Sequence, residues 1–209
     1  MTATAAVSLR GVSAAHGATQ GRPIDLDVDP GARVWISGPS GVGKTSLLYV
    51  IGALTRAVRG TVTIGGSTVG SARDADVVRR HHVGFVLQDA QLVEHWSVRR
   101  NLATMAGEDR YPAAAERLSS WGVDVEGRQP RSLSGGERQR VVTAGALAKG
   151  AAVIVADEPT SSLDESARDS VIAAFLEASR AGAAVVVSSH DSAWAGWATQ
   201  HVRLGGPDA

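Results

Sequence analysis

Three things are absent from this sequence of 209 residues, and each absence excludes a class of protein. There is no cysteine, which excludes disulfides, thiolate metal sites and cysteine nucleophiles, and which fits a reducing cytoplasm. There is no charge excess, because 21 Lys and Arg balance 21 Asp and Glu, so no overall field favours nucleic acid or anionic lipid. No apolar run approaches the roughly 18 residues that a membrane helix needs, so we expect no segment that crosses a bilayer.

The remaining composition is that of an ordinary folded protein. Apolar residues make up 44% of the chain and charged residues 20%, and the length suits one domain with a real core. The Ala-rich start, residues 1–21, is interrupted by Arg10 and His16 and lacks a positive segment followed by an unbroken apolar stretch. We therefore expect no export signal and a cytoplasmic location.

Short apolar runs alternate with helical stretches along most of the chain. The runs predict strands at 33–37, 83–87, 151–156 and 183–187. The stretches predict helices after Gly43 and at 134–148 and 165–178. This alternation is typical of an α/β protein with a mostly parallel sheet.

Two other parts of the chain have different patterns. Residues alternate between apolar and polar at 7–12, 24–28 and 61–64, which predicts an N-terminal antiparallel β patch. The stretch from Gln88 to Leu133 has helical patches, such as 113–121, and no buried strand. We expect residues 1–209 to form one domain, with 89–133 as the main part of an inserted helical subdomain.

A glycine-rich loop follows the first predicted buried strand. It fits the pattern G-x-x-x-x-G-K-[ST] and consists of Gly38, Pro39, Ser40, Gly41, Val42, Gly43, Lys44 and Thr45, with Ser46 next in the chain. Glycines let the backbone and a helix N-terminus approach phosphates closely, while Lys44 adds a charge and Thr45 a hydroxyl for Mg²⁺. The strand before the loop and the helix after it favour a phosphate-binding loop, or P-loop, over a chance turn.

Two adjacent carboxylates end another predicted strand. Asp157 and Glu158 follow the run Val153-Ile154-Val155-Ala156, and ligands gather at the carboxyl ends of parallel strands. Asp157 is placed to hold Mg²⁺, and Glu158 to orient or deprotonate a water that attacks a γ-phosphate. Taken alone, the pair is about equally well explained as carboxylates at a helix start.

The segment Leu133-Ser134-Gly135-Gly136-Glu137-Arg138-Gln139-Arg140 resembles the signature motif of ATP-binding cassette proteins. As in that family, it lies between the P-loop and the Asp-Glu strand. A serine at a helix start followed by two glycines exposes N–H groups, which can receive the γ-phosphate of ATP held by another subunit. Without the rest of the pattern, a simple helix cap is the better explanation of Ser134.

The resemblance extends over nearly the whole chain and implies further roles. Gln88 matches the family's Q-loop, which would place it beside Mg²⁺ with Thr45 and Asp157. Ser162-Leu163-Asp164 resembles the D-loop, and His190 the switch histidine. His16 stands about where the family has an aromatic residue that stacks on adenine, although imidazole offers a smaller face.

The family implies an α/β P-loop ATPase that uses ATP and Mg²⁺, with Glu158, His190 and Gln88 in catalysis. It also implies a dimer with a second copy or a paralogous cassette, in which Ser134, Gly135 and Gly136 complete the partner's site. A transmembrane permease would hold the dimer at the inner face of the membrane. The P-loop, Ala156-Asp157-Glu158-Pro159-Thr160 and Val98-Arg99-Arg100-Asn101-Leu102 most resemble the lipoprotein-release, macrolide-export and cell-division subgroup.

The chain departs from the family pattern at two places in the signature helix. Glu137 stands where the family usually has Gln, a change we expect to preserve activity. Gly145 stands where an Arg is usual, and a glycine inside a helix costs about 1 kcal/mol relative to Ala, so we expect weaker subunit packing.

Three alternative functions differ in what the sequence should contain. A cassette that drives a mechanical or signalling membrane partner needs the same ATPase residues. An ATPase acting on DNA or RNA predicts a coiled-coil insertion or second cassette, and the basic run at 79–82 is better explained as a solvated helix end. A purely structural subunit is disfavoured because Lys44, Asp157, Glu158 and His190 are all present. We expect no nucleic-acid partner.

Overall fold

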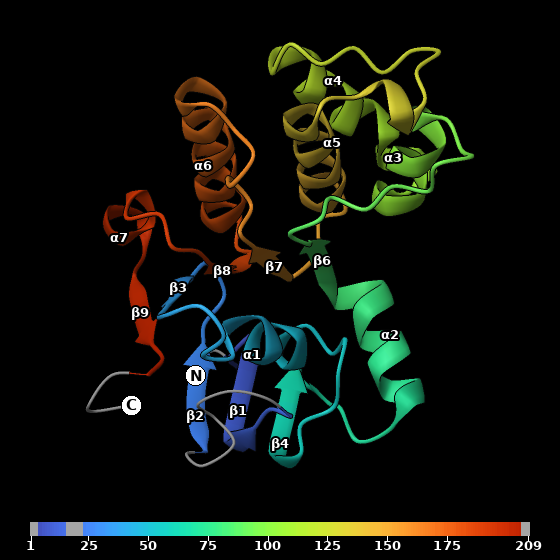
Figure 1. Cartoon of the computed structure of the whole chain (residues 1–209). Coiled ribbons are helices and arrows are strands. Elements are labelled where there is room, and N and C mark those ends of the chain that lie inside the picture. Colours follow the sequence, from blue (N-terminus) through green and yellow to red (C-terminus); the bar gives the residue numbers. More distant parts are fainter. Residues whose placement is uncertain (1–3, 16–22, 206–209) are drawn as a thin grey trace.

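A parallel sheet forms the centre of the protein in the computed structural model, which describes residues 4–15 and 23–205 (Figure 1). Its five strands lie in the order β6-β7-β8-β3-β9. They are β6 (Val83–Val86), β7 (Val153–Asp157), β8 (Ala184–Ser188), β3 (Arg33–Ser37) and β9 (Gln200–Arg203). The first four confirm the strands predicted from apolar runs, within two residues at each end.

Strand β7 shows how the sheet is covered on both faces. All five of its residues are buried, as are all five of β8. Val153 and Val155 pack in the apolar cluster that contains α1 (Lys44–Ile51), whereas Ile154 and Ala156 pack in the cluster that contains α6 (Glu165–Arg180). Successive side chains of a strand point to opposite faces, so an unbroken apolar run is what a sheet between two helical layers requires.

The N-terminal segments form a second sheet, which is antiparallel as predicted. Its strands are β1 (Val7–Ser13), β2 (Ile24–Val28), β4 (Arg59–Ile64) and β5 (Ser67–Thr68), in the order β2-β1-β4-β5. Leu9 is paired with both Leu26 and Val62, and these three residues lie in the same apolar cluster as α1. Helix α1 therefore packs between the two sheets and is anchored from both sides.

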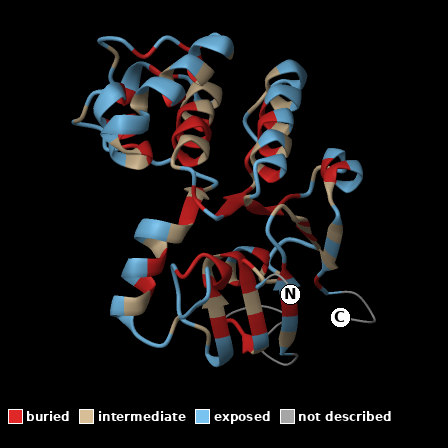
Figure 2. Ribbon diagram, turned by 180° about the vertical axis from the view of Figure 1, so that it is seen from behind, coloured by how far each residue is buried: buried red, intermediate tan, exposed pale blue. Residues whose placement is uncertain are grey.

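Three helices form a separate layer beside α6 (Figure 1). They are α3 (Val98–Ala106), α4 (Tyr111–Ser120) and α5 (Gly135–Ala148), and short 3-10 turns lie at Glu108–Arg110 and Pro130–Ser132. Their apolar faces pack on one another and on the α6 side of the sheet, and their outer faces are exposed (Figure 2). Helices α3 and α4 lie within the segment 89–133.

Several elements were not predicted from the sequence, among them α2 (Ala72–His82) and the edge strand β9. Helix α2 buries only Ala75 and Val78, so its sequence is polar, and a capping box between Ser71 and Asp74 starts it. Its last four residues are the basic run 79–82, which confirms that run as a helix end. A short helix α7 (Ala193–Trp197) precedes β9. Within the described ranges, every helix is too short or too polar to cross a membrane.

Candidate functional site

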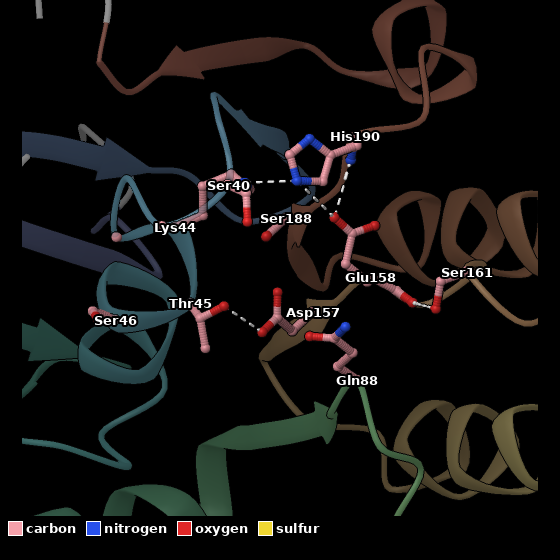
Figure 3. A pocket seen from close by; sticks show the side chains of 12 residues that line it. Ser40, Lys44, Thr45, Ser46, Gln88, Asp157, Glu158, Ser161, Ser188 and His190 are labelled. Carbon is pink, nitrogen blue, oxygen red and sulfur yellow. Dashed lines mark hydrogen bonds and ion pairs between the residues drawn. The ribbon is translucent and has the colours of Figure 1, made fainter. Parts of the chain in front are cut away.

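A cavity of about 550 Å³ lies at the carboxyl ends of β3, β7 and β8, where α1 begins (Figure 3). Ligands of α/β proteins gather at this edge of the sheet. The cavity is lined by Ser40, Gly41, Gly43, Lys44, Thr45, Ser46, Gln88, Asp157, Glu158, Ser161, Ser188 and His190. It thus brings together most of the site residues predicted from the sequence, and its lining comes from four separate segments of the chain.

The P-loop connects β3 to α1 and depends on its glycines. Gly43 caps α1 with φ of 101°, in the left-handed region that glycine adopts readily. Gly38 has φ of 148°, and a Cβ atom there would lie 2.5 Å from the carbonyl oxygen of Leu204. Val42 packs beside Gly38, so it shapes the loop without lining the cavity. The loop thereby presents the N-terminus of α1 to the cavity, a favourable position for an anion.

The ammonium group of Lys44 is held by three acceptors. Only 7% of this residue is exposed, and its Nζ donates to the carbonyl oxygens of Gly38, at 3.0 Å, and Pro39, at 3.1 Å. The third contact is with Nε2 of His190, at 3.0 Å. Because an ammonium can only donate, this contact requires a lone pair on Nε2 and places the ring proton on Nδ1.

Oxygen groups converge on the other side of the cavity. Thr45 Oγ1 donates to Asp157 Oδ2 at 2.8 Å, and Asp157 is only 2% exposed. Gln88 follows β6 and extends into the cavity near Asp157 (Figure 3). A hydroxyl, a carboxylate and an amide thus lie around one space, and hard cations such as Mg²⁺ prefer oxygen ligands.

Glu158 has a strained backbone, and its carboxylate accepts two hydrogen bonds. Its φ is 46°, a conformation that a non-glycine residue adopts at a cost of about 1–3 kcal/mol. Oε2 accepts a hydrogen bond from Ser189 Oγ at 2.9 Å, and Oε1 accepts one from the backbone N–H of His190 at 3.1 Å. The Nε2 atom of His190 lies 3.8 Å from Oε1. The segment after β8 therefore fixes the direction of the carboxylate.

The turn at Ser134 lies outside this cavity. Neither Ser134, Gly135 nor Gly136 is among the lining residues. Ser134 caps α5, where its hydroxyl accepts from the N–H of Glu137 at 3.2 Å and its own N–H donates to Glu137 Oε2 at 2.8 Å. The structure thus confirms the helix cap and separates it from the P-loop of the same chain.

Glu137 is held by a second partner besides the cap. Arg128 donates to its carboxylate at 2.6 and 3.4 Å, and the side chains are 28% and 21% exposed for Arg128 and Glu137. The guanidinium, more than the hydrogen bonds from Ser134, lowers the pKa of Glu137 from 4.5 to about 2. A glutamine at this position keeps the acceptor for the cap and loses the ion pair.

Two other sequence features have structural explanations. Gly145 is buried against α3, where a Cβ atom would lie 3.0 Å from Met105 Cβ and 3.3 Å from Leu102 Cδ1. The absence of a side chain at position 145 therefore permits close packing of α3 on α5 within this chain. Asp164, predicted as part of a D-loop, caps α6 by accepting from the N–H of Ala167 at 2.9 Å.

Sequence reasoning missed three serines, and one predicted residue has no described position. Ser161 and Ser188 line the cavity, and Ser189 holds Glu158. All three lie within three residues of Glu158 or His190, and that proximity was the available signal. His16 lies outside the described residues.

Comparison with known proteins agrees with this geometry. Residues 22–161 match the ABC transporter family. The lipoprotein-releasing system ATP-binding protein LolD of Novosphingobium aromaticivorans is 38% identical over 193 residues, which cover 88% of this chain and 86% of LolD. The L-cystine transport system ATP-binding protein TcyN of Escherichia coli is 39% identical over 194 residues, which cover 86% of this chain and 78% of TcyN.

Two further comparisons concern a longer relative and a solved structure. The macrolide export ATP-binding/permease protein MacB of Rhodopseudomonas palustris is 37% identical over 190 residues, but this chain spans only 29% of its length. The dimeric post-hydrolysis structure of the ATP-binding cassette MJ0796, bound to ADP and Pi, superposes with a TM-score of 0.83 at 29% identity. That superposition covers 95% of this chain and 94% of the cassette.

Proposed function

This chain belongs to the ABC transporter family, and we propose that it is the ATP-hydrolysing subunit of an exporter or a lipoprotein-handling system. The observation that carries the proposal is the cavity in which a P-loop, a strand-end carboxylate pair and a histidine meet. The similarity to LolD over most of the length of both chains favours lipoprotein handling among the family's functions.

Lys44 and the N-terminus of α1 supply the binding site for the phosphates of ATP. The phosphates would take the place of His190 at Lys44, because both need the same ammonium protons. Nε2 of His190, released from Lys44, is then free to carry a ring proton and donate it in a hydrogen bond to the γ-phosphate. The contact between Lys44 and His190 therefore makes the histidine sensitive to the nucleotide.

The oxygen groups opposite Lys44 fit a magnesium ion. Thr45, Asp157 and Gln88 offer a hydroxyl, a carboxylate and an amide oxygen, and Mg²⁺ is usually held by one or two carboxylates plus phosphate oxygens. When bound, the ion would neutralise charge on the β- and γ-phosphates. The hydrogen bond from Thr45 to Asp157 keeps the two groups together on one side of the cavity.

Glu158 is the residue placed to activate water. Its carboxylate lies at the cavity and is directed by Ser189 and the N–H of His190. As the water oxygen attacks the γ-phosphorus, the bond to the ADP oxygen breaks and the water proton passes to Glu158. The products are ADP and phosphate, and the proton then returns to solvent.

Hydrolysis in this scheme requires two chains. The Ser134 turn does not line the cavity of its own chain, and the N–H groups at the start of α5 are available to the γ-phosphate bound by another subunit. A second copy, or a paralogous cassette, paired face to face would complete each site. The dimeric cassette of similar fold supports this arrangement.

A groove near Gln88 suits a permease. It has a volume of about 280 Å³, lies between β6 and helices α3 and α5, and is lined by Val83, Gly84, Phe85, Leu87, Gln91, Thr104, Met105, Val142, Ala146 and Lys149. The ammonium of Lys149 is occupied by the carbonyl oxygens of Arg79 and Val83, at 2.8 and 2.6 Å, so the floor is mainly apolar. A permease bound in this groove would hold the chain at the inner face of the cell membrane. Movements of Gln88 would be transmitted to that permease.

Affinity purification tests this assignment. A tagged Glu158→Gln chain, which should hold ATP without hydrolysing it, is purified from detergent-solubilised native membranes and its partners are identified by mass spectrometry. A permease with an extracytoplasmic domain supports transport or lipoprotein handling. A membrane partner with no transport activity in vesicles would favour a mechanical or signalling role, and recovery of soluble proteins or nucleic acid alone would refute the permease.

A further inference from the structure

One buried polar group in the cavity has no role in the scheme above, the hydroxyl of Ser188. The residue is 0% exposed, and its Oγ has no hydrogen-bond partner among residues 4–15 and 23–205. The other orphaned side-chain atoms in that part of the chain belong to Gln139, Trp194 and Trp197, none of which lines the cavity. Buried hydroxyls without a partner are rare in native proteins because losing water is costly.

The sheet directs this hydroxyl toward the P-loop. Ala184 and Val186 of β8 pack in the cluster that contains α1, so Ser188, two residues further, faces the same side. Ser188 is paired in register with Asp157, and residues paired in this way share a face of the sheet. Figure 3 shows the Ser188 side chain between Lys44 and Asp157.

We propose that the Ser188 hydroxyl is a further binding group for magnesium nucleotide, which accepts a hydrogen bond from a water in the hydration shell of Mg²⁺. The inference rests on the proposed function. Mg²⁺ releases its waters reluctantly and usually keeps several, and these waters need acceptors. Asp157 already accepts from Thr45, whereas Ser188 has two lone pairs and no partner in the described structure.

Ser188→Ala isolates the hydroxyl, because it removes one oxygen that makes no hydrogen bond with the described residues. ATP binding is measured by calorimetry in a Glu158→Gln background, once with Mg²⁺ and once with EDTA. We expect affinity to fall about 5–10-fold with Mg²⁺, as for loss of one hydrogen bond between uncharged groups. We expect no change with EDTA and no loss of thermal stability without nucleotide.

Two further variants separate binding from packing. Ser188→Thr keeps the hydroxyl and should restore the affinity for magnesium nucleotide. Ser179→Ala is the matched control, since Ser179 is also buried but its Oγ donates to Gly31 at 2.8 Å, away from the cavity. It should lower thermal stability and leave ATP affinity unchanged in both conditions.

The outcomes distinguish this inference from the proposed function. If the Glu158→Gln parent binds ATP and Ser188→Ala binds it equally well with Mg²⁺, the inference is wrong and the proposed function stands. A loss of affinity that is the same with EDTA, or a loss of stability without nucleotide, would assign Ser188 a structural role and also refute it. If the parent itself fails to bind ATP, both fail.

Discussion

The hydrogen bonds that span the cavity join residues far apart in the sequence, whereas those made by Ser134 and Glu137 join near neighbours. Thr45 and Asp157 are 112 positions apart, and Lys44 and His190 are 146 apart. Glu137, in contrast, meets Ser134 three positions away and Arg128 nine positions away. The cavity is thus assembled by the whole fold, and we propose that it presents its groups to a nucleotide. The Ser134 turn is held by local contacts, and we propose that it presents N–H groups to another molecule.

The largest effect should come from the cavity. Glu158→Gln should lower the rate of ATP hydrolysis about 10²–10⁴-fold, because the amide is a poor proton acceptor. ATP binding should persist, since the amide replaces none of the P-loop contacts. Phosphate release and equilibrium binding measure the two quantities on the same preparation.

Ser161→Ala serves as the control for that variant. Its hydroxyl donates to the backbone carbonyl of Glu158 at 3.1 Å and not to the carboxylate. The hydrolysis rate should stay near that of the unaltered chain. Retention of full hydrolysis in Glu158→Gln would mean that another group takes the proton.

The next effect concerns the packing that supports the Ser134 turn. Gly145→Arg introduces the residue that is usual in the family, but α3 leaves no space for its side chain. This substitution should therefore lower the free energy of unfolding by about 3 kcal/mol. Gly145→Ala should change it by less than about 1 kcal/mol, because the gain in helix propensity opposes the tight contact with Met105. Urea unfolding measures the free energy of unfolding of both variants and so shows whether α3 packs closely on α5 at this position. A fully stable Arg variant would show that α3 moves away at little cost.

The smallest effect concerns the ion pair beneath the turn. Glu137→Gln removes the charge that Arg128 stabilises and should cost about 1.5 kcal/mol at pH 7, allowing for the partial exposure of both side chains. Because folding lowers the pKa of Glu137 from 4.5 to about 2, this stability is present above pH 4.5 and is lost as the pH falls toward 2.

Thermal unfolding of both chains between pH 7 and pH 3 tests that pH dependence. The difference in melting temperature should narrow below about pH 4.5, the pKa of a glutamate in the unfolded chain. A difference that stays constant over this range would show that the ion pair does not stabilise the turn.

Sequence patterns predicted the parts of the site that have a local signal. The glycine spacing of the P-loop, the apolar run before Asp157 and the serine before two glycines each depend on a few consecutive residues. The same holds for β7, whose apolar run reports burial on both faces. These features are set by backbone chemistry and side-chain periodicity, which a single sequence contains.

The remaining features depend on which elements become neighbours. Ser188 faces the P-loop because β8 pairs with β7, and the contact between Lys44 and His190 crosses the whole chain. Helix α2 is polar and held by its cap, and β9 is a four-residue edge strand with exposed alternate positions, so neither has a strong apolar pattern. Such features follow from tertiary packing and were not available from the residues alone.

Complementation between two inactive chains tests most directly whether the cavity and the Ser134 turn of different molecules form one site. Lys44→Ala disables the P-loop, and Ser134→Arg disables the turn, so neither should hydrolyse ATP alone. In an equimolar mixture each mixed dimer has one site with both defects and one intact site. The mixture should therefore recover about a quarter of the unaltered activity, because about half of randomly paired dimers are mixed. A mixture as inactive as its components would contradict the two-chain site.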